Sequence, residues 1–288
     1  MLAVLGDLVE DVVVWPGGPV EPGTDTAARV FRRRGGSAAN VAAAAAALGA
    51  PVRFLGRVGA DAAGTALADG LAGLGVDVRV QRAGTTGCVV VLVDADGERT
   101  MLPDRGAAAE LADPDPGWPD GVTLLHLPVY SLLDEPCAGA ARALAARVRD
   151  AGGAVSVDAA SAGSLRAHGP ARFLDDLAAL GPAHLLANRA EADLLGLPGT
   201  APPGTAVVVK DGPRPALVHL PGVARLGLPG VPVAPAPVDG VRDTTGAGDA
   251  FAAGYLTAVH AGADPLVAVA RGHACAARVL CGPGAAGA

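Results

Sequence analysis

The chain contains very little lysine and few aromatic side chains. Among its 22 basic residues, Lys210 is the single lysine, and aromatic residues make up 3% of the 288 positions. No G-x-x-x-x-G-K-[ST] run occurs, which excludes a P-loop, and no strand lysine follows an N-terminal glycine-rich loop, which excludes the protein-kinase arrangement. Because the formal net charge is −7, no broad basic surface is available, and we expect neither a nucleic-acid partner nor a membrane partner.

Cysteine and long apolar runs are also scarce. The four cysteines lack metal-ligand spacing, and we interpret them as buried thiols of a reducing compartment. They are Cys88, Cys137, Cys275 and Cys281. The segment Met1–Asp7 has no basic residue and reaches an acid early, so we expect no signal peptide. The alanine run at 42–47 is stopped by Gly49, far short of a membrane span. These features predict a cytoplasmic protein.

Short apolar runs alternate with longer helical stretches along most of the chain. Helices are expected at 38–48, 61–74 and 135–150. Strands are expected at 2–5, 52–58, 122–127, 154–157, 183–187 and 205–209. Strands separated by helices of this length pair in parallel through right-handed crossovers. The pattern predicts an α/β fold, a three-layer α/β/α sandwich with a mostly parallel central sheet, in a single domain of residues 1–288.

Two insertions, at about 10–34 and 87–104, break this alternation. Segments 11–15 and 27–33 are extended, and 88–93 and 98–102 form a hairpin across Asp94–Gly97. Four strands without intervening helices predict a small separate β-sheet. Ligands of α/β proteins bind beyond the carboxyl ends of the strands, so a sheet projecting there would act as a lid that excludes water. The alternative is an edge extension without a function.

The run Asp243–Phe251 (DTTGAGDAF) carries the strongest chemical signal. It joins an extended segment to an apolar helix expected at 250–261. Its glycines allow a ligand close to the backbone, and the free N–H groups of a helix start attract an anion. Asp249 lies at the same turn, where it can accept a proton from a hydroxyl that attacks a phosphoryl group. The alternative is that Asp249 is only the N-cap of the helix.

A second run, Gly35-Gly36-Ser37-Ala38-Ala39-Asn40, opens the first long helix. With the Asp243–Phe251 run it resembles the two signatures of the ribokinase-like (PfkB) carbohydrate kinase family. Further matches in the family's order are at 56–61, 97–100, 188–191 and 273–285. The resemblance covers the whole chain. It implies an ATP-dependent, Mg²⁺-requiring kinase that transfers the γ-phosphate to a hydroxyl, expected to be a primary one, of a small sugar.

The resemblance also implies roles for individual residues in the transfer and acceptor sites. Asp249 matches the general base, and the amides of Gly246, Ala247 and Gly248 match the anion hole for the migrating phosphate. The sugar-hydroxyl ligands of the family match Asp7, Gly35, Gly36 and Asn40, whose amide is expected to be free to bind a hydroxyl. Ser37 departs from the lysine of ribokinases proper, so ribose itself is not specified.

On the nucleotide side, Asn188 and Glu191 match a motif that works near the triphosphate and its Mg²⁺ through water; the alternative is a helix capping box. Gly212 matches a glycine that lets the nucleotide lie flat, whereas the nearby Lys210 is interpreted as a solvated strand end. His273 matches a position beside the adenine, with a structural histidine as the alternative.

The resemblance further implies a monovalent-cation site, with K⁺ as the candidate ion. Asp243 and Thr245 match its side-chain positions, and carbonyls near Val279, Gly282 and Gly284 would complete it.

Two other functions stay open. A nucleoside kinase of the same family would need an aromatic stack on the base, and Trp15 and Phe31 in the lid are the local candidates. A non-catalytic sugar- or nucleotide-binding member is the second. Arg105 either faces an anionic group of the substrate or, as we favour, is a solvated loop residue.

Finally, one face of the lid needs cover, which predicts a homodimer formed through the lids.

Overall fold

The structure is a computed structural model, which describes residues 1–94, 98–222, 229–238, 241 and 244–281. Its centre is a nine-stranded sheet in the order β13-β12-β11-β10-β9-β8-β1-β4-β5. Within it only β12 runs antiparallel to its neighbours. The strands are β1 (Leu2–Leu5), β4 (Val52–Val58), β5 (Asp77–Arg82), β8 (Leu124–Pro128), β9 (Ala154–Asp158), β10 (His184–Asn188), β11 (Ala206–Asp211), β12 (Arg214–His219) and β13 (Val231–Val233).

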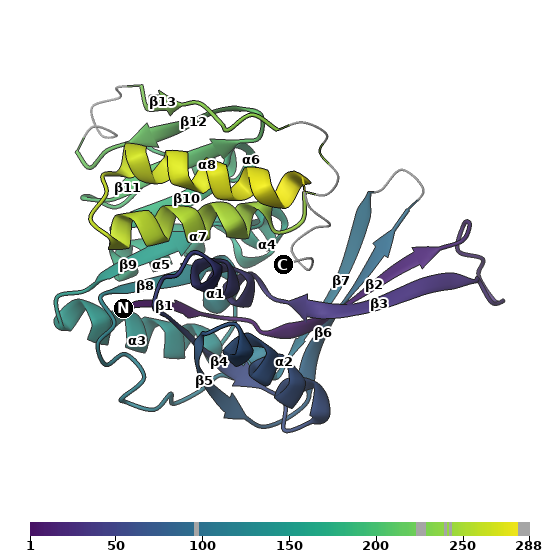
Figure 1. Ribbon diagram of the computed structural model, residues 1–288. Helices are drawn as coiled ribbons and strands as arrows, with labels where there is room; N and C mark the ends of the chain where they lie inside the picture. The colour runs from purple at the N-terminus through teal and green to yellow at the C-terminus, as the bar shows by residue number, and fades with distance from the viewer. Residues whose placement is uncertain (95–97, 223–228, 239–240, 242–243, 282–288) are drawn as a thin grey trace.

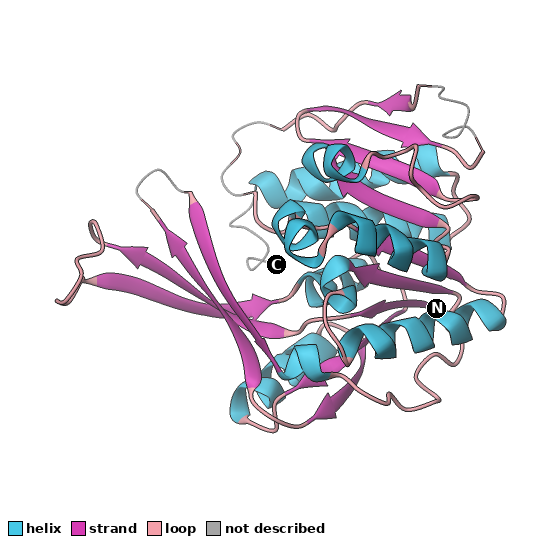
Figure 2. Cartoon of the chain, turned by 180° about the vertical axis from the view of Figure 1, so that it is seen from behind, coloured by secondary structure: helices cyan, strands magenta, loops and turns pink. Residues whose placement is uncertain are grey.

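Helices cover both faces of this sheet (Figures 1 and 2). One face carries α1 (Ser37–Ala47), α2 (Ala62–Gly73), α7 (Ala247–His260) and α8 (Pro265–Cys281). The other carries α3 (Cys137–Asp150), α4 (Ala162–His168), α5 (Pro170–Leu180) and α6 (Arg189–Leu195), with the 3₁₀ turns η1 (Ala107–Glu110) and η2 (Val129–Leu132) at its margin. Strand side chains alternate between two cores, because Leu2 and Val4 join the first core while Ala3 and Leu5 join the second. The predicted three-layer sandwich is confirmed.

Helix starts follow local chemistry, with boundaries one to three residues from those expected. Asp61 caps α2, as predicted, by accepting the Gly64 N–H at 2.8 Å. Helix α7 begins at Ala247 rather than Ala250, because Gly246 adopts φ 75° and takes the N-cap position itself. The first turn of α7 therefore contains Asp249, which positions this carboxylate inside the helix and not before it.

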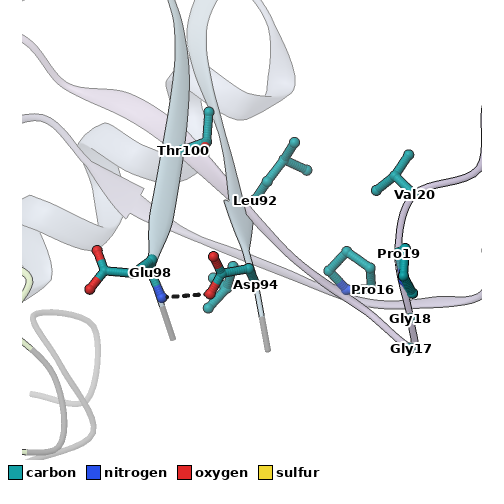
Figure 3. Close-up of a pocket in the computed structure, with 10 residues that line it drawn as sticks. Pro16, Gly17, Gly18, Pro19, Val20, Leu92, Asp94, Glu98 and Thr100 are labelled. Atoms are coloured by element: carbon teal, nitrogen blue, oxygen red, sulfur yellow. Dashed lines mark hydrogen bonds between the residues drawn. The ribbon is translucent and has the colours of Figure 1, made fainter. Parts of the chain in front are cut away.

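Four further strands form the predicted separate sheet, in the order β3-β2-β6-β7. They are β2 (Val9–Pro16), β3 (Ala28–Gly35), β6 (Thr86–Val93) and β7 (Arg99–Gly106). This sheet, which we call the lid sheet, projects from the sandwich as two long hairpins (Figure 1). The turn between β6 and β7 lies partly outside the described residues, but Glu98 N–H donates to Asp94 Oδ1 at 2.8 Å (Figure 3).

The tip of the lid sheet is hollowed. A cavity of about 470 Å³ lies between loop 16–20 of one hairpin and the ends of β6 and β7 in the other, and Figure 3 shows Leu92, Thr100 and Val20 around it. A second hollow of about 600 Å³ is lined by Trp15, Phe31 and neighbouring residues. Both hollows are made of lid residues and lie apart from the ends of the central strands.

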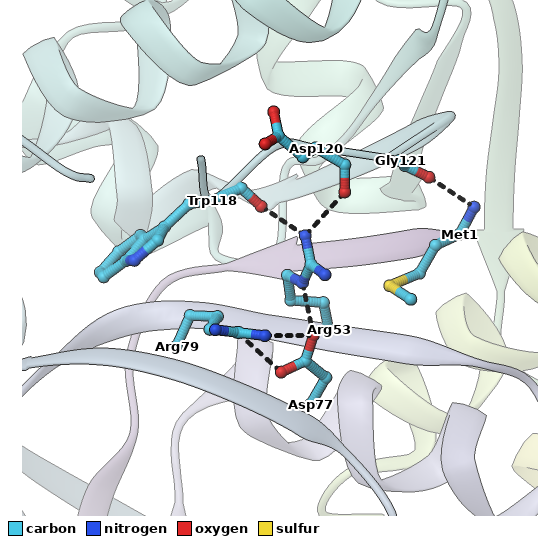
Figure 4. A network of polar contacts seen from close by, with 7 residues as sticks. All are labelled: Met1, Arg53, Asp77, Arg79, Trp118, Asp120 and Gly121. Carbon is cyan, nitrogen blue, oxygen red and sulfur yellow. Dashed lines mark hydrogen bonds and ion pairs between the residues drawn. The ribbon is translucent and has the colours of Figure 1, made fainter. Parts of the chain in front are cut away.

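The amino ends of β4 and β5 in the central sheet are fixed by a polar network around Arg53 (Figure 4). Its guanidinium donates to Asp77 Oδ2 at 2.7 Å and to the carbonyl oxygens of Trp118 and Asp120 at 2.7 and 2.9 Å. Since the Arg53 side chain is only 11% exposed, this network secures the loop that leads into β8.

Two expectations about the whole chain can be checked here. In the described part of the chain, no helix is both long enough and apolar enough to span a membrane. The four cysteines, all among the described residues, form no disulfide. Cys137 and Cys275 are buried as predicted, but Cys88 is half-buried and Cys281 is exposed, because Cys281 is the last residue of α8.

Candidate active site

Asp249 lies between two packed helices. Its Oδ1 accepts a hydrogen bond from Ser37 Oγ at 2.7 Å, and its Oδ2 accepts one from Asn40 Nδ2 at 3.0 Å. Both donors are on the first turn of α1. The Asn40 nitrogen is therefore engaged, because the starts of α1 and α7 face each other, whereas Asn40 Oδ1 is buried without a hydrogen-bond partner among the described residues. The alternative of Asp249 as N-cap is also wrong, since Gly246 holds that position.

The surroundings of Asp249 make it a stronger base than an ordinary carboxylate. Burial raises the pKa of Asp249 to about 6, the hydrogen bonds from Ser37 and Asn40 oppose the rise, and the charge of Asp158 adds to it while that of Lys210 opposes it. At neutral pH the carboxylate is still mostly ionised. It can therefore take a proton from a hydroxyl that binds within hydrogen-bond distance of it.

A second carboxylate, Asp11 of β2, was missed by sequence reasoning. Burial, and then the charge of Asp249, raise the pKa of Asp11 to about 6, while Arg33 lowers it. A Cβ added at Gly35 would fall on the Asp11 carboxylate, so the two residues are in contact. The available signal was the alternation of β2, which turns Asp11 and Val13 to one face of the lid sheet.

Gly36 and Asp7 bring the first strand and α1 together. Gly36 has φ 97°, and a Cβ at this position would fall on the Asp7 carbonyl oxygen, so glycine is required for this close approach. The Asp7 carboxylate accepts two hydrogen bonds from Arg105, Nε to Oδ2 at 2.9 Å and Nη2 to Oδ1 at 2.8 Å. The predicted hydroxyl ligand Asp7 is thus already paired with a guanidinium.

Arg105 is not the solvated loop residue that we favoured. It belongs to β7, its side chain is 15% exposed, and its Nη1 lies 3.6 Å from Asp134. Burial alone would lower the pKa of Arg105, but the hydrogen bonds and charge of Asp7 raise it. Lid sheet and sandwich are therefore tied together, close to the end of β1, by a bidentate, charge-assisted pair.

Asn188 and Glu191 form the capping box that was the alternative interpretation. Asn188 Oδ1 accepts the Glu191 N–H at 2.9 Å, and the Asn188 N–H donates to Glu191 Oε2 at 2.8 Å. Glu191 Oε1 also accepts from Asn188 Nδ2 at 2.6 Å. Burial, followed by the charge of Asp158, raises the pKa of Glu191. With both oxygens engaged, Glu191 suits contact with an ion through water.

Asp158 and Lys210 are the remaining charged pair at the strand ends. Lys210 Nζ donates to Asp158 Oδ2 at 2.8 Å, and the two side chains are 16% and 8% exposed. The interpretation of Lys210 as a solvated strand end is therefore wrong. Asp158 ends β9, Asn188 ends β10 and Lys210 is the next-to-last residue of β11, so three adjacent parallel strands deliver them to one edge.

Other predicted residues are scattered around this edge. Gly212 lies in the turn between β11 and β12 with φ 57°. His273 is buried in α8, where its ring packs edge-on against Phe251 at 5.2 Å between centroids. Thr245 lies in the turn before α7. Asp243, Gly282 and Gly284 lie outside the described residues, so the predicted cation site is described only at Thr245 and Val279.

The oxygen atoms near the carboxyl ends of β9, β10 and β11 suit Mg²⁺ that is bound mainly through water. Within the described ranges no three His, Cys, Asp or Glu side chains are grouped to hold a metal ion directly. Mg²⁺ keeps several waters and is bound through one or two carboxylates together with substrate phosphates. Glu191, on the first turn of α6 beside Asn188, is such a carboxylate, so the residues present fit Mg²⁺ that arrives with a nucleotide and is held through water.

A parallel α/β sandwich with a lid sheet, and a carboxylate beside the amides of a helix start, are compatible with transfer of an anionic group to a hydroxyl. Comparison with known proteins narrows this class. The sequence pattern of the pfkB family of carbohydrate kinases matches residues 1–288. An ATP-dependent ribose-1-phosphate kinase of Halopiger xanaduensis is 33% identical over 251 residues, 84% of this chain and 79% of that protein. A fructokinase of Klebsiella pneumoniae is 34% identical over 287 residues, 93% of this chain and 87% of that protein.

The chain belongs to the pfkB family of carbohydrate kinases. The resemblance seen in the sequence is thus confirmed, and the protein is an ATP-dependent phosphotransferase. Among solved structures, the adenosine kinase from Sinorhizobium meliloti is similar, with a TM-score of 0.85 and 21% identity over 99% of this chain and 94% of that one. At this identity the likeness bears on the fold, which is ribokinase-like as predicted.

Proposed function

We propose that the protein transfers the γ-phosphate of ATP to a hydroxyl, expected to be primary, of a small sugar, with Asp249 as general base. The observation that carries the proposal is the position of Asp249, on the first turn of α7 and held by Ser37 and Asn40. A carboxylate with a pKa of about 6 is ionised at neutral pH and basic enough to accept the hydroxyl proton.

The start of α7 supplies the electrostatic part of the proposed mechanism. The N–H groups of Gly246, Ala247 and Gly248 lie at the start of α7, where helix amides lack intrahelical acceptors; that of Ala247 donates to the Thr244 carbonyl at 3.2 Å, a contact that the phosphoryl group would share or replace. They would hold the migrating phosphoryl group next to the base, as donors of an anion hole. Removing one donor of such a hole costs roughly 3 kcal/mol of transition-state stabilisation.

The remaining roles follow the same geometry. Asp7, Gly35, Gly36 and Asn40 would orient the acceptor next to Asp249, together with Asp11, under the lid sheet that would exclude water. Asn188 and Glu191 would hold Mg²⁺ through water, and the ion when bound neutralises phosphate charge. Gly212 and His273 would lie along the nucleotide, and Thr245 would contribute to a K⁺ site.

A sugar is favoured over a nucleoside by the placement of Trp15, one of the two aromatic residues of the lid that could stack on a base. Trp15 is 44% exposed and lines the second hollow of the lid tip together with Phe31. Trp15 lies four residues beyond Asp11 in β2, roughly 13 Å along the strand. It is therefore displaced from the acceptor space, where a stacked base would have to lie.

A coupled ADP-release assay tests the proposal across sugars and nucleosides at a concentration on the order of 1 mM, the upper end of typical KM values. The panel includes fructose and ribose 1-phosphate, because the two curated relatives carry these names, together with ribose, adenosine and inosine. We expect turnover with one or more sugars. Turnover with nucleosides alone would establish the nucleoside kinase instead, and binding without any turnover would establish the non-catalytic member.

We further propose that the protein forms a homodimer through the outer face of the lid sheet. The strand register gathers apolar side chains on the face opposite Asp11, and two of them, Val30 and Leu102, are 55% and 54% exposed. The set is Val12, Val14, Val30, Val90, Leu92 and Leu102. An uncovered sheet face of this kind calls for a partner.

Light scattering on a sizing column at micromolar concentration checks the dimer. We expect a mass of two chains, and a single-chain mass for Leu102→Asp. Met101→Asp is the matched control, because Met101 is equally exposed but points to the other face of the sheet. A single-chain mass for the unmodified protein would refute the proposed interface.

A further inference from the structure

The single lysine of the chain, Lys210, lies buried at the carboxyl end of β11, next to the candidate active site. The Lys210 ammonium donates to Asp158 at 2.8 Å and lies 5.8 Å from the ring centroid of Phe251. Phe251 is two residues beyond Asp249 on α7. The ammonium therefore lies between the end of β9 and the first turns of α7.

Asp158 is held so that it presents one oxygen to Lys210. Its other oxygen, Oδ1, accepts the N–H of Ala160 at 2.9 Å. Ala160 adopts φ 50°, a left-handed conformation that costs free energy at a residue other than glycine and that marks functional turns. The backbone thus fixes the partner of the lysine, and the Ala160 N–H keeps one of the two carboxylate oxygens hydrogen-bonded whatever the lysine does.

The Lys210 ammonium has donor capacity left over. It carries three N–H donors, and Asp158 is its one hydrogen-bond partner among the residues that the structure describes. The side chain is 16% exposed, and its ammonium lies at the carboxyl ends of β9 and β11 beside Asp158. A buried ammonium with unused donors beside a helix start is a cation site for phosphate oxygens.

Charge balance gives the same indication. Asp158, Glu191 and Asp249 are three acids at this edge, and Lys210 lowers the pKa of both Glu191 and Asp249. A nucleotide brings further negative charge to these carboxylates. Lys210 offsets part of this negative charge, and a charge interaction is strong in a weakly screened site.

We propose that Lys210 binds the terminal phosphates of the nucleotide, leaving or sharing its ion pair with Asp158 when they arrive. The inference rests on the proposed function, because it assumes that the amides of α7 mark the phosphate site. It assigns to this chain a phosphate-binding lysine on a strand end, in place of the P-loop lysine that the sequence lacks.

The test is calorimetric binding of ADP and AMP in EDTA, which keeps magnesium out of the comparison. We expect Lys210→Met to weaken ADP binding by roughly 10- to 100-fold, the worth of a charge-assisted hydrogen bond, and AMP binding by less than about threefold. Asp158→Asn should instead tighten ADP binding, because it removes a negative charge and frees the lysine. Lys210→Arg should restore most of the ADP affinity.

These signs separate a ligand from a structural ion pair, since breaking a structural pair from either side would weaken or spare ADP binding alike. Should Lys210→Met fold poorly, the double variant Lys210→Met/Asp158→Asn removes both charges and must still show the selective loss of ADP affinity. Arg53→Met is the matched control for loss of a buried cation, because Arg53 and its network (Figure 4) lie at the amino end of β4, whereas Lys210 lies at the carboxyl end of β11.

Unchanged ADP binding in Lys210→Met, or weaker ADP binding in Asp158→Asn, would overturn the inference. Neither result depends on turnover, so the inference can fail while the proposed sugar kinase stands. An inactive protein that nonetheless loses ADP affinity in Lys210→Met would leave the inference standing and overturn the proposed function.

Discussion

Replacing Ser37 by alanine should shift the pH dependence of the enzyme without lowering its activity at high pH. Ser37 Oγ donates to Asp249 at 2.7 Å, and this bond favours the ionised carboxylate, so its loss raises the pKa of Asp249 above about 6. A hydrogen bond to a charged group is worth roughly 1.5–3 kcal/mol. One pKa unit corresponds to about 1.36 kcal/mol. Because Asp249 is only half-buried, we take the lower end, a rise of about one unit.

The consequence can be worked out for two pH values. At about pH 6.5 the ionised fraction of the base falls from about three quarters to about one quarter, so kcat/KM should fall about threefold. At about pH 8.5 both proteins have an ionised base and should be equally active. The assay is kcat/KM for the acceptor from about pH 5.5 to 9, with Ser37→Thr as the variant that keeps the hydroxyl. An acid limb that stays in place in Ser37→Ala would refute the reasoning.

Three stability predictions follow, each measured by urea unfolding. Asp249→Asn should raise the free energy of unfolding by roughly 1–3 kcal/mol at pH 8. The folded-state pKa of Asp249 is raised to about 6, so the unmodified protein loses stability as pH rises through this value, and the asparagine variant does not. The gain should vanish near pH 4, and an equal gain at both pH values would contradict the prediction. Arg105→Met should lower the free energy of unfolding by roughly 3–5 kcal/mol, because it leaves Asp7 buried and unpaired. Arg32→Met is the control: the Arg32 guanidinium that pairs with Glu10 is exposed, so its loss should cost less than about 1 kcal/mol. Equal losses would argue against the buried pair. Gly36→Ala should lower the free energy of unfolding by at least about 2 kcal/mol and raise the KM for the acceptor, because backbone strain and a clash with the Asp7 carbonyl combine. Gly49→Ala is the control: Gly49 has φ 79° but open space around it, so this variant should lose only the strain energy, roughly 1–2 kcal/mol.

The fold could be predicted because its signals are local. The alternation of buried strands and helices, the Asp61 cap and the glycine-bounded lid hairpins each act within a few residues, and the structure confirms the three-layer sandwich and the separate lid sheet. The start of α7 could not be placed to the residue, because the choice between Gly246 and Asp249 as N-cap depends on the packing of α1 against α7.

The candidate site was predicted in outline but not in its pairings. Sequence motifs identified Asp249 and the glycines, since their spacing is local. The partners come from distant segments, as in Asp7 with Arg105 and Asp158 with Lys210, and no periodicity links residues that only the sheet brings together. Exposure was misjudged for the same reason, because a charged residue near a strand end is interpreted as solvated until its partner is seen.

The central claim, that Asp249 removes the proton of the acceptor hydroxyl, is tested most directly by Asp249→Asn in a single-turnover assay. Acceptor and nucleotide binding are measured alongside by calorimetry. The account predicts that phosphoryl transfer slows by roughly 10²- to 10⁴-fold, while both dissociation constants stay within about threefold. Transfer within about tenfold of the unmodified protein would contradict it.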